Sequence, residues 1–268
     1  MGARGEGTEP GTDPVSFLDG PTPLAFAHRG GALLPANDGI ENTLTAFRNA
    51  VELGYRYLET DVHTSRDGVV YAFHDVELTR MTGTVSAFRD LGSAGIDAIL
   101  VGGREPIPRL ADLLHAFPDA RFNIDVKADD AVKPTLAVLR DADALDRVCL
   151  SSFSGARLAR LRAAAPAVPT CFSPVEIALM RFGPTRWIQS LGRRRGGACV
   201  QAPFRTRQTT VVTPEFVRRA HAVDLQVHVW TIDDPAEMRY LLDIGVDGLM
   251  SDRVDVLRDV LRERGEWR

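Results

Sequence analysis

The sequence is poor in cysteine, with only Cys149, Cys171 and Cys199 among its 268 residues. An odd number of cysteines without close pairs is poor material for a disulfide framework, which excludes the class of small disulfide-stapled secreted proteins. Each cysteine lies in a short apolar run. We therefore interpret all three as small buried side chains in a protein of a reducing compartment.

Long apolar runs are also absent, since no stretch approaches the roughly 18 apolar residues of a membrane-spanning helix. The N-terminal residues are rich in glycine, proline and acids, and they lack the apolar core of a secretory signal. These absences predict a cytoplasmic protein with no integral membrane segment. Residues 1–20 are expected to form a flexible tail, and residues 21–268 a single domain.

Basic residues are not in excess either, because 32 lysines and arginines stand against 36 acidic residues, a formal net charge of -4. A nucleic-acid partner needs a basic face, so none is expected. A small substrate that carries phosphate is still compatible with the negative net charge, because a local cationic site with a bound metal can override the overall charge.

The sequence does contain a regular alternation of short apolar runs with segments that have helical periodicity. Continuous apolar runs of this length suit parallel strands that are buried on both faces. Between them, Leu44, Phe47 and Val51 recur at helical spacing before Gly54, and Pro235 opens a second clear helix. The runs are Leu24–Ala27, Tyr57–Val62, Phe122–Val126, Val148–Ser151, Val168–Phe172, Ala198–Gln201, Val227–Trp230 and Asp247–Met250.

Eight strands that alternate with helices predict an α/β fold, a (β/α)8 TIM barrel, although six of these runs would also suit a doubly wound sheet. About 60 residues separate the second and third runs, against roughly 20–35 elsewhere. This spacing indicates a small insertion after the second strand, at about residues 75–115. Loops at the carboxyl ends of barrel strands usually carry such insertions.

Two acidic residues interrupt the second apolar run. Glu59 and Asp61 are two positions apart, so both point to the same face of one strand. Inside a barrel, two uncompensated carboxylates are costly, and the usual resolutions are a shared proton or a bound cation. Because Mg²⁺ and Ca²⁺ prefer oxygen ligands, the pair predicts a metal site rather than an outward-facing pair on an exposed edge.

The third run repeats this pattern with Asp125 and Lys127, again two positions apart. The aspartate can complete a site of three carboxylates with Glu59 and Asp61, and the lysine can neutralise a phosphate oxygen. An internal Asp125–Lys127 ion pair that only balances charge is the alternative, and the two explanations are compatible.

Histidines follow two of the apolar runs. His28 precedes Arg29 and two glycines, and His74 ends the run that begins at Val69. Arginine offers a fork of donors that suits a phosphoryl group, and two histidines supply the acid and base of a two-step phosphoryl transfer. A buried histidine beside a salt-bridged arginine explains His28 alone equally well, and a surface-loop position explains His74 alone.

The seventh run ends at Trp230, an aromatic residue that can wall an alcohol or lipid-like group at the mouth of a barrel. Taken alone, a tryptophan in a strand is more often part of the core. Its position nevertheless matches that of the charged residues, because His28, Glu59, Asp61, Asp125, Lys127 and Trp230 all fall at the carboxyl ends of predicted strands. Barrel enzymes place their active sites there.

The order and spacing of these motifs resemble those of the glycerophosphodiester phosphodiesterase family. The resemblance extends from residue 24 to about residue 255. Its motifs are His28-Arg29-Gly30, Glu41-Asn42-Thr43, Glu59-Thr60-Asp61-Val62, Asp67-Gly68, His74-Asp75, Leu78 to Gly83, Asn123 to Lys127, Val229-Trp230-Thr231 and Gly245 to Gly248.

The resemblance implies a metal-dependent phosphodiesterase that hydrolyses glycerophosphodiesters to sn-glycerol 3-phosphate and an alcohol, with one Mg²⁺ or Ca²⁺ ion. A cyclic phosphate intermediate is our mechanistic hypothesis for this reaction. The resemblance further implies that His28 and His74 act as acid and base and that Arg29 and Lys127 hold the phosphate. From its position at the mouth of the barrel, we also expect Trp230 to contact the substrate. It assigns the metal to Glu59, Asp61 and Asp125, with Glu41 at its border. The family usually has Glu where this sequence has Asp125, so the ion must shift or recruit a water.

Two alternatives remain open. The segment Val175–Leu191 is apolar enough to line the entrance for a lipid, and the arginines 193–195 follow it. These features would suit a lysophospholipase D or a sphingomyelinase D-like activity, with peripheral lipid contact. An amphipathic barrel helix with a solvated basic cap is the simpler explanation. The other alternative is a non-catalytic phosphate-binding barrel, which would predict broken site residues.

Overall fold

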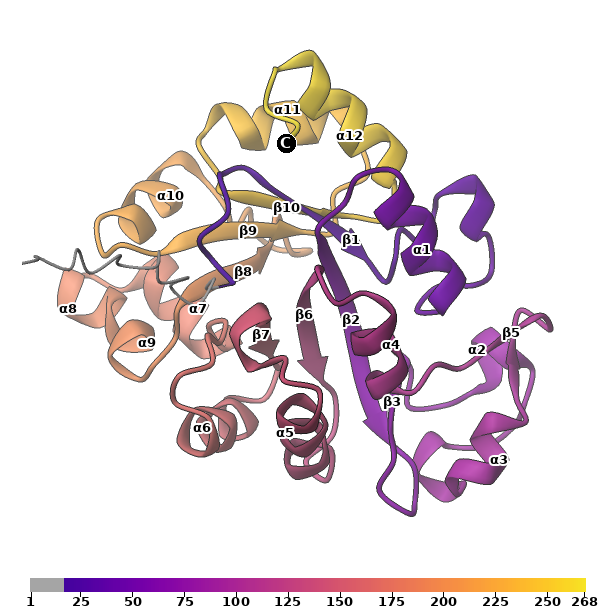
Figure 1. The fold of residues 1–268 in the computed structure, drawn as a ribbon. Helices are drawn as coiled ribbons and strands as arrows, with labels where there is room; N and C mark the ends of the chain where they lie inside the picture. The colour runs from indigo at the N-terminus through magenta and orange to yellow at the C-terminus, as the bar shows by residue number, and fades with distance from the viewer. Residues whose placement is uncertain (1–16) are drawn as a thin grey trace, which may run out of the picture.

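The predicted strands alternate with helices and curl into a parallel α/β barrel in the computed structural model, which describes residues 17–268 (Figure 1). Hydrogen bonds connect neighbouring parallel strands in the order β7-β6-β2-β1-β10-β9-β8. These strands are β1 (Leu24–His28), β2 (Tyr57–Thr64), β6 (Arg121–Val126), β7 (Val148–Ser151), β8 (Cys199–Pro203), β9 (Gln226–Trp230) and β10 (Gly248–Ser251).

The fifth predicted strand is reduced to two residues between β7 and β8. Thr170 makes a parallel bridge to Leu150, and Cys171 makes one to Cys199. Pro169 has no N–H group, so the ladder cannot extend on that side. With this segment the parallel ring closes, and the predicted barrel class is confirmed.

Helices surround the strands, and each main helix follows one strand as predicted (Figure 1). The side chain of Thr43 accepts a hydrogen bond from the Ala46 amide and caps the first helix, and Asp234 caps the helix that Pro235 opens. The outer helices are α1 (Leu44–Glu52), α4 (Leu110–Ala116), α5 (Val132–Asp141), α6 (Gly155–Ala164), α7 (Pro174–Phe182), α8 (Arg186–Gln189), α9 (Leu191–Arg194), α10 (Pro214–His221), α11 (Pro235–Asp243) and α12 (Val254–Glu263).

The insertion after β2 forms a small lobe beside the barrel (Figure 1). Its own apolar cluster includes Tyr71, Phe73 and Phe88. The end of the predicted 75–115 span belongs to the barrel, because Leu110 and Leu113 of α4 are buried in the main core. The lobe consists of β3 (Val70–Ala72), α2 (Thr79–Thr82), α3 (Ser93–Asp97), β4 (Leu100–Val101) and β5 (Glu105–Pro106), and the short 3-10 helices lie at Pro35–Asn37, Phe88–Asp90 and Leu145–Arg147.

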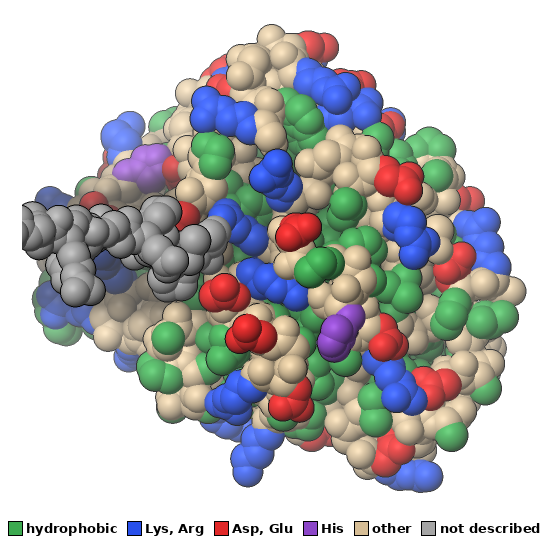
Figure 2. Space-filling model, viewed as in Figure 1, with side chains coloured by type: hydrophobic (Ala, Val, Ile, Leu, Met, Phe, Trp, Pro, Cys, Tyr) green, Lys and Arg blue, Asp and Glu red, His purple; other side chains and the backbone are tan. Residues whose placement is uncertain are grey.

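Acidic and basic side chains are mixed over the face of the molecule seen in Figure 2. This mixture agrees with the nearly balanced composition of the chain. Within residues 17–268, no helix is long and apolar enough to cross a membrane.

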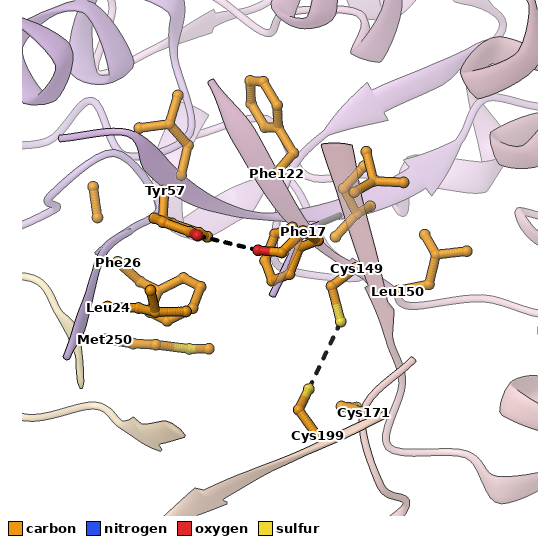
Figure 3. Packing of buried hydrophobic residues seen from close by; sticks show 14 of the residues in the cluster. Phe17, Leu24, Phe26, Tyr57, Phe122, Cys149, Leu150, Cys171, Cys199 and Met250 are labelled. Carbon is orange, nitrogen blue, oxygen red and sulfur yellow. Dashed lines mark hydrogen bonds between the residues drawn. The ribbon is translucent and has the colours of Figure 1, made fainter. Parts of the chain in front are cut away.

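Figure 3 shows part of the main core, where Phe17 packs beside Phe26 and Tyr57. The ring of Phe17 is fully buried, and its carbonyl accepts a hydrogen bond from Tyr57 at 3.1 Å. Residues 1–16 of the predicted tail lie outside the described residues, whereas Phe17 packs against the barrel. All three cysteines are buried and free, as the sequence indicated, and the sulfurs of Cys149 and Cys199 are 3.9 Å apart.

Candidate active site

A cavity of about 450 Å³ opens where the strands end. All of the predicted site residues except Glu41 line it. One part of its wall, which we call the charged half, is formed by His28, Arg29, Glu59, Asp61, His74, Asp125 and Lys127. The other part, the apolar half, includes Phe153, Phe172, Pro174, Ile177, Ala178, Phe182 and Val211.

Sheet register brings the three predicted carboxylates into the charged half. Asp61 of β2 pairs with Asp125 of β6, and Glu59 pairs with the preceding strand at His28. Each carboxylate residue is at most 5% exposed. The ammonium group of Lys127 lies 2.7 Å from an oxygen of Asp61 and 2.7 Å from an oxygen of Asp125. The predicted Asp125–Lys127 ion pair is therefore present, and Lys127 connects two strands.

The pKa values of these carboxyl groups differ because their cationic neighbours differ. Burial, followed by the nearby charge of Asp61, raises the pKa of Glu59 to about 7. Burial also raises the pKa of Asp125, and Lys127 offsets only part of that rise. The pKa of Asp61 is lowered, because Lys127 and Arg29 outweigh the effect of its burial. The cluster thus contains more buried negative charge than its two cations compensate.

The donor set fits a hard divalent cation. Three carboxylates converge on one cavity, and the Oδ1 atom of Asp125 is buried without a hydrogen-bond partner. Among residues 17–268, no three histidine, cysteine or acidic side chains already stand together as a metal-binding group. Lys127 instead pairs with one oxygen of Asp61 and with one oxygen of Asp125. A cation held by all three acids would require the Lys127 ammonium group to move aside.

The first histidine is held firmly at the end of β1. The Nδ1 atom of His28 lies 2.7 Å from Asp252, which follows β10, and its Nε2 atom lies 3.8 Å from Glu59. Burial acts to lower the pKa of His28, but Glu59 and Asp252 outweigh it, so the pKa is raised. Because Asp252 accepts a hydrogen bond from the Nδ1–H group of His28, Nε2 is left to face the charged half.

The backbone after His28 turns sharply toward α1 and α12. Arg29 has a φ of 51°, and Gly30 and Gly31 have φ values of 82° and 86°. A Cβ atom on Gly31 would lie 2.6 Å from a methyl group of Val254, so this position needs glycine. The two glycines in the motif therefore allow the loop to fold against the barrel while Arg29 points into the cavity.

The second histidine is held by a series of ion-pair contacts. The Nδ1 atom of His74 lies 2.6 Å from Asp75, and Asp75 accepts a hydrogen bond from Arg80 at 2.5 Å. Burial acts to raise the pKa of Asp75, but Arg80 and His74 lower it to about 2. Asp75 is therefore ionised and orients the His74 ring as Asp252 orients that of His28.

Glu41 stands apart from the other predicted metal ligands because it does not line the cavity. It accepts hydrogen bonds from Arg29 at 3.1 Å and from the Nη2 atom of Arg80 at 2.7 Å. Arg29 also lies 3.3 Å from Asp61. In this arrangement Glu41 fixes the guanidinium groups that border the charged half.

Trp230 and Phe153 join the two halves of the cavity. Their rings pack edge to face, with centroids 5.7 Å apart, and Lys127 lies 5.6 Å from the Phe153 centroid. The sequence reasoning placed Trp230 here but missed Phe153, which follows β7. The remaining histidines lie elsewhere: His63 stacks on Phe88, and His228 is buried.

Sequence reasoning also missed the side chains that position the two histidines. Asp75 was visible in the His74-Asp75 motif, yet nothing in the sequence indicated its contact with Arg80. Asp252 stood at the carboxyl end of a predicted strand, which was the only available signal. Asn42 belongs to the Glu41-Asn42-Thr43 motif, and its side-chain amide donates a hydrogen bond to Asp61 at 3.3 Å.

At the carboxyl face of this barrel, two histidines can transfer protons and two cations can stabilise a phosphoryl group, an arrangement that suits hydrolysis of a phosphoric diester. A model of the glycerophosphoryl diester phosphodiesterase family matches residues 28–256. The chain therefore belongs to this family, and the predicted enzyme class is confirmed, which removes the non-catalytic alternative.

The similarity extends over the whole barrel. A Mycobacterium tuberculosis protein named "Probable glycerophosphodiester phosphodiesterase 2" is 41% identical over 267 residues, which cover 96% of this chain and 97% of the relative. Human lysophospholipase D GDPD1 is 25% identical, with 88% of this chain and 85% of the relative covered.

Solved structures share the fold. A glycerophosphodiester phosphodiesterase from Agrobacterium tumefaciens superposes with a TM-score of 0.73 at 24% identity, covering 89% of this chain and 99% of that one. A phosphodiesterase from Oleispira antarctica gives a TM-score of 0.76 at 22% identity, covering 90% of this chain and 97% of that one.

Proposed function

We propose that the protein hydrolyses glycerophosphodiesters to sn-glycerol 3-phosphate and an alcohol, with His28 and His74 as the acid and base. One observation carries the proposal: each histidine lines the same cavity and has its Nδ1 atom bonded to an aspartate. Two rings oriented in this way present two Nε2 atoms to one substrate. The Oleispira antarctica relative is solved in complex with the product sn-glycerol-3-phosphate, which supports the choice of product.

Proton transfer by the two histidines divides the reaction into two steps. In the first, one histidine accepts the proton of the glycerol 2-hydroxyl, whose oxygen attacks phosphorus. The other histidine donates a proton to the leaving alcohol, and a cyclic phosphate forms. In the second, the histidines exchange roles: one accepts a proton from water, which opens the ring, and the other protonates the released oxygen.

The cations and the carboxylates have separate tasks in this scheme. Arg29 and Lys127 hold the phosphoryl oxygens and stabilise the charge that develops on them. Glu59, Asp61 and Asp125 would hold one Mg²⁺ or Ca²⁺ ion, and Glu41 would act at the border of that site through Arg29. When bound, the ion adds positive charge beside the phosphoryl group and acidifies the attacking hydroxyl.

Lysophospholipase D activity is the second candidate. The apolar half of the cavity favours it, because its phenylalanines suit the acyl chain of a lysophospholipid. The human relative that carries this name covers most of the chain. A screen of small glycerophosphodiesters and of lysophospholipids with each metal, followed by phosphorus NMR, would separate the two candidates and detect a released cyclic phosphate.

Removal of either catalytic histidine tests the scheme. We expect His28→Ala and His74→Ala each to lower kcat by about 10²–10⁴-fold, because each loses a proton-transfer group. His115→Ala is the matched control, since His115 is exposed on α4 and bonds only to its own helix. Near-wild-type turnover in either of the two active-site variants would refute the scheme.

A further inference from the structure

The segment from residue 174 to residue 197 is strongly positive in a negatively charged chain. It contains five arginines, at positions 181, 186, 193, 194 and 195, and a single acidic residue, Glu176. Glu176 is buried and paired with Arg162 at 2.8 Å, so it does not offset charge at the surface. The segment carries +4 and the rest of the chain -8, given the overall charge of -4.

The same segment exposes large apolar side chains. Val175 is 65% exposed, Phe182 is 62% exposed and Trp187 is 58% exposed. Single exposed apolar residues are ordinary, but these three occur within thirteen positions on α7 and α8, which lie side by side (Figure 1). Val175 and Phe182 border a shallow hollow that is lined almost entirely by apolar atoms, and Ile188, the residue after Trp187, lines it as well.

This hollow lies next to the catalytic cavity. Pro174, Ala178 and Phe182 line both of them. Residues of α7 therefore contribute both to the apolar half of the active site and to the outer surface of the barrel. Whatever covers the hollow also lies against the mouth of the cavity.

Cations and aromatic rings alternate on this surface. The guanidinium group of Arg194 lies 5.4 Å from the Trp187 ring centroid, and that of Arg181 lies 5.0 Å from the Phe182 ring centroid. The side chain of Arg195 makes no hydrogen bond or ion pair with any residue between 17 and 268. A bilayer surface presents the complementary order, with anionic phosphates above an apolar layer.

We propose that this surface, which we call the α7–α9 surface, docks on an anionic lipid bilayer. It is formed by Val175, Phe182, Trp187, Ile188, Arg194 and Arg195. The apolar side chains enter the interfacial region, and the arginines meet the head groups. Docking places the mouth of the catalytic cavity against the membrane, where diesters derived from lipids are released.

Vesicle sedimentation of the full chain tests the docking. We expect the protein to bind vesicles of phosphatidylcholine with one third phosphatidylglycerol, to bind pure phosphatidylcholine far more weakly, and to lose binding at high salt. Equal binding to both vesicles would contradict charge complementarity. Absence of vesicle binding, or formation of a dimer instead, would overturn the proposal.

Matched variants locate the bound surface. Arg194→Glu and Arg195→Glu should each weaken binding to anionic vesicles by at least about fivefold. Arg89→Glu, which changes an exposed arginine of the insertion, should have little effect. Val175→Ser should weaken binding several-fold, whereas Val85→Ser, at a position that is 89% exposed in the insertion, should not. Equal losses in test and control variants would place the contact elsewhere.

Insertion into the bilayer has its own readout. Brominated phosphatidylcholine in the anionic vesicles should quench part of the tryptophan emission, and Trp187→Phe should abolish that quenching. Unchanged quenching in Trp187→Phe would overturn the proposed contact.

None of Val175, Trp187, Arg194 and Arg195 lines the catalytic cavity, so turnover of a soluble diester without vesicles should stay unchanged in variants of these residues. Failure of the proposed reaction would appear in that assay, and failure of docking only in the vesicle assays.

Discussion

The two halves of the cavity are built from different parts of the chain. The carboxylates of the charged half lie on adjacent strands in fixed register, and they are almost fully buried. The apolar half comes from α7 and from loops after the strands, and Phe153 and Phe182 are each 62% exposed. The sheet therefore fixes the groups that react, whereas the surrounding segments shape the space for the alcohol.

Electrostatics separates the halves further. In the charged half, Asp61 pairs with both Arg29 and Lys127, and Lys127 also pairs with Asp125, so a change at one position disturbs several others. The aromatic residues of the apolar half make independent ring contacts. We expect substitutions in the charged half to reduce the rate of the chemical steps, and substitutions in the apolar half to alter substrate preference.

Apart from the two catalytic histidines, the largest effect is expected at Asp61. Asp61→Asn removes the charge shared by Lys127 and Arg29, so we expect turnover to fall by about 10²–10³-fold. Because Arg29 keeps Glu41 and Lys127 keeps Asp125 as a partner, unfolding free energy should fall by only about 1–3 kcal/mol. Kinetics and denaturant titration measure the two changes. Asp97→Asn, which breaks an exposed pair with Arg109, is the control and should change both little.

A smaller effect is expected at the aspartates that orient the histidines. Asp252→Asn and Asp75→Asn should lower kcat by about 10–100-fold while KM and unfolding free energy change little. The loss should be greater for Asp252→Asn, because His28 is more buried than His74. Steady-state kinetics measured at several pH values would show a shifted pH profile of kcat in these variants. A change confined to KM would contradict an orienting role.

The smallest effect is expected in the apolar half. Phe182→Ala should raise KM by about fivefold for a soluble diester with an aliphatic alcohol, because apolar contact area is lost. KM for a diester with a small polar alcohol should stay within about twofold, since that alcohol lacks the apolar area that Phe182 would cover. Phe182→Leu, which keeps most of the apolar area, serves as the control. Equal changes for both substrates would remove the distinction between the halves.

The strand-borne part of the fold and site could be predicted from the sequence because it depends on short-range patterns. The alternation of side chains along a strand placed Glu59 and Asp61 on one face, and parallel pairing brought Asp125 beside them. The barrel class followed from eight apolar runs. The fifth run was predicted too long, because Pro169 limits the ladder to two bridging residues.

Long-range contacts between side chains could not be predicted. Asp252 reaches His28 across 224 positions, and only the closure of the barrel brings them together. Arg80 lies in the insertion, whose packing on Glu41 and Asp75 has no local pattern. The position of Lys127 between two acids likewise depends on strand register together with the rotamer of a long side chain. The metal-binding, catalytic and substrate-binding roles of the site residues stay predictions.

Calorimetric titration of Mg²⁺ or Ca²⁺ into chelator-treated protein tests the central claim about the charged half most directly. The account predicts one binding site per chain, with affinity strongly reduced in Asp125→Asn, because this substitution removes one of the three carboxylates. It also predicts that turnover, abolished by the chelator, returns in proportion to site occupancy. Full turnover in chelator with no heat of binding, or equal affinity in Asp125→Asn, would contradict the account.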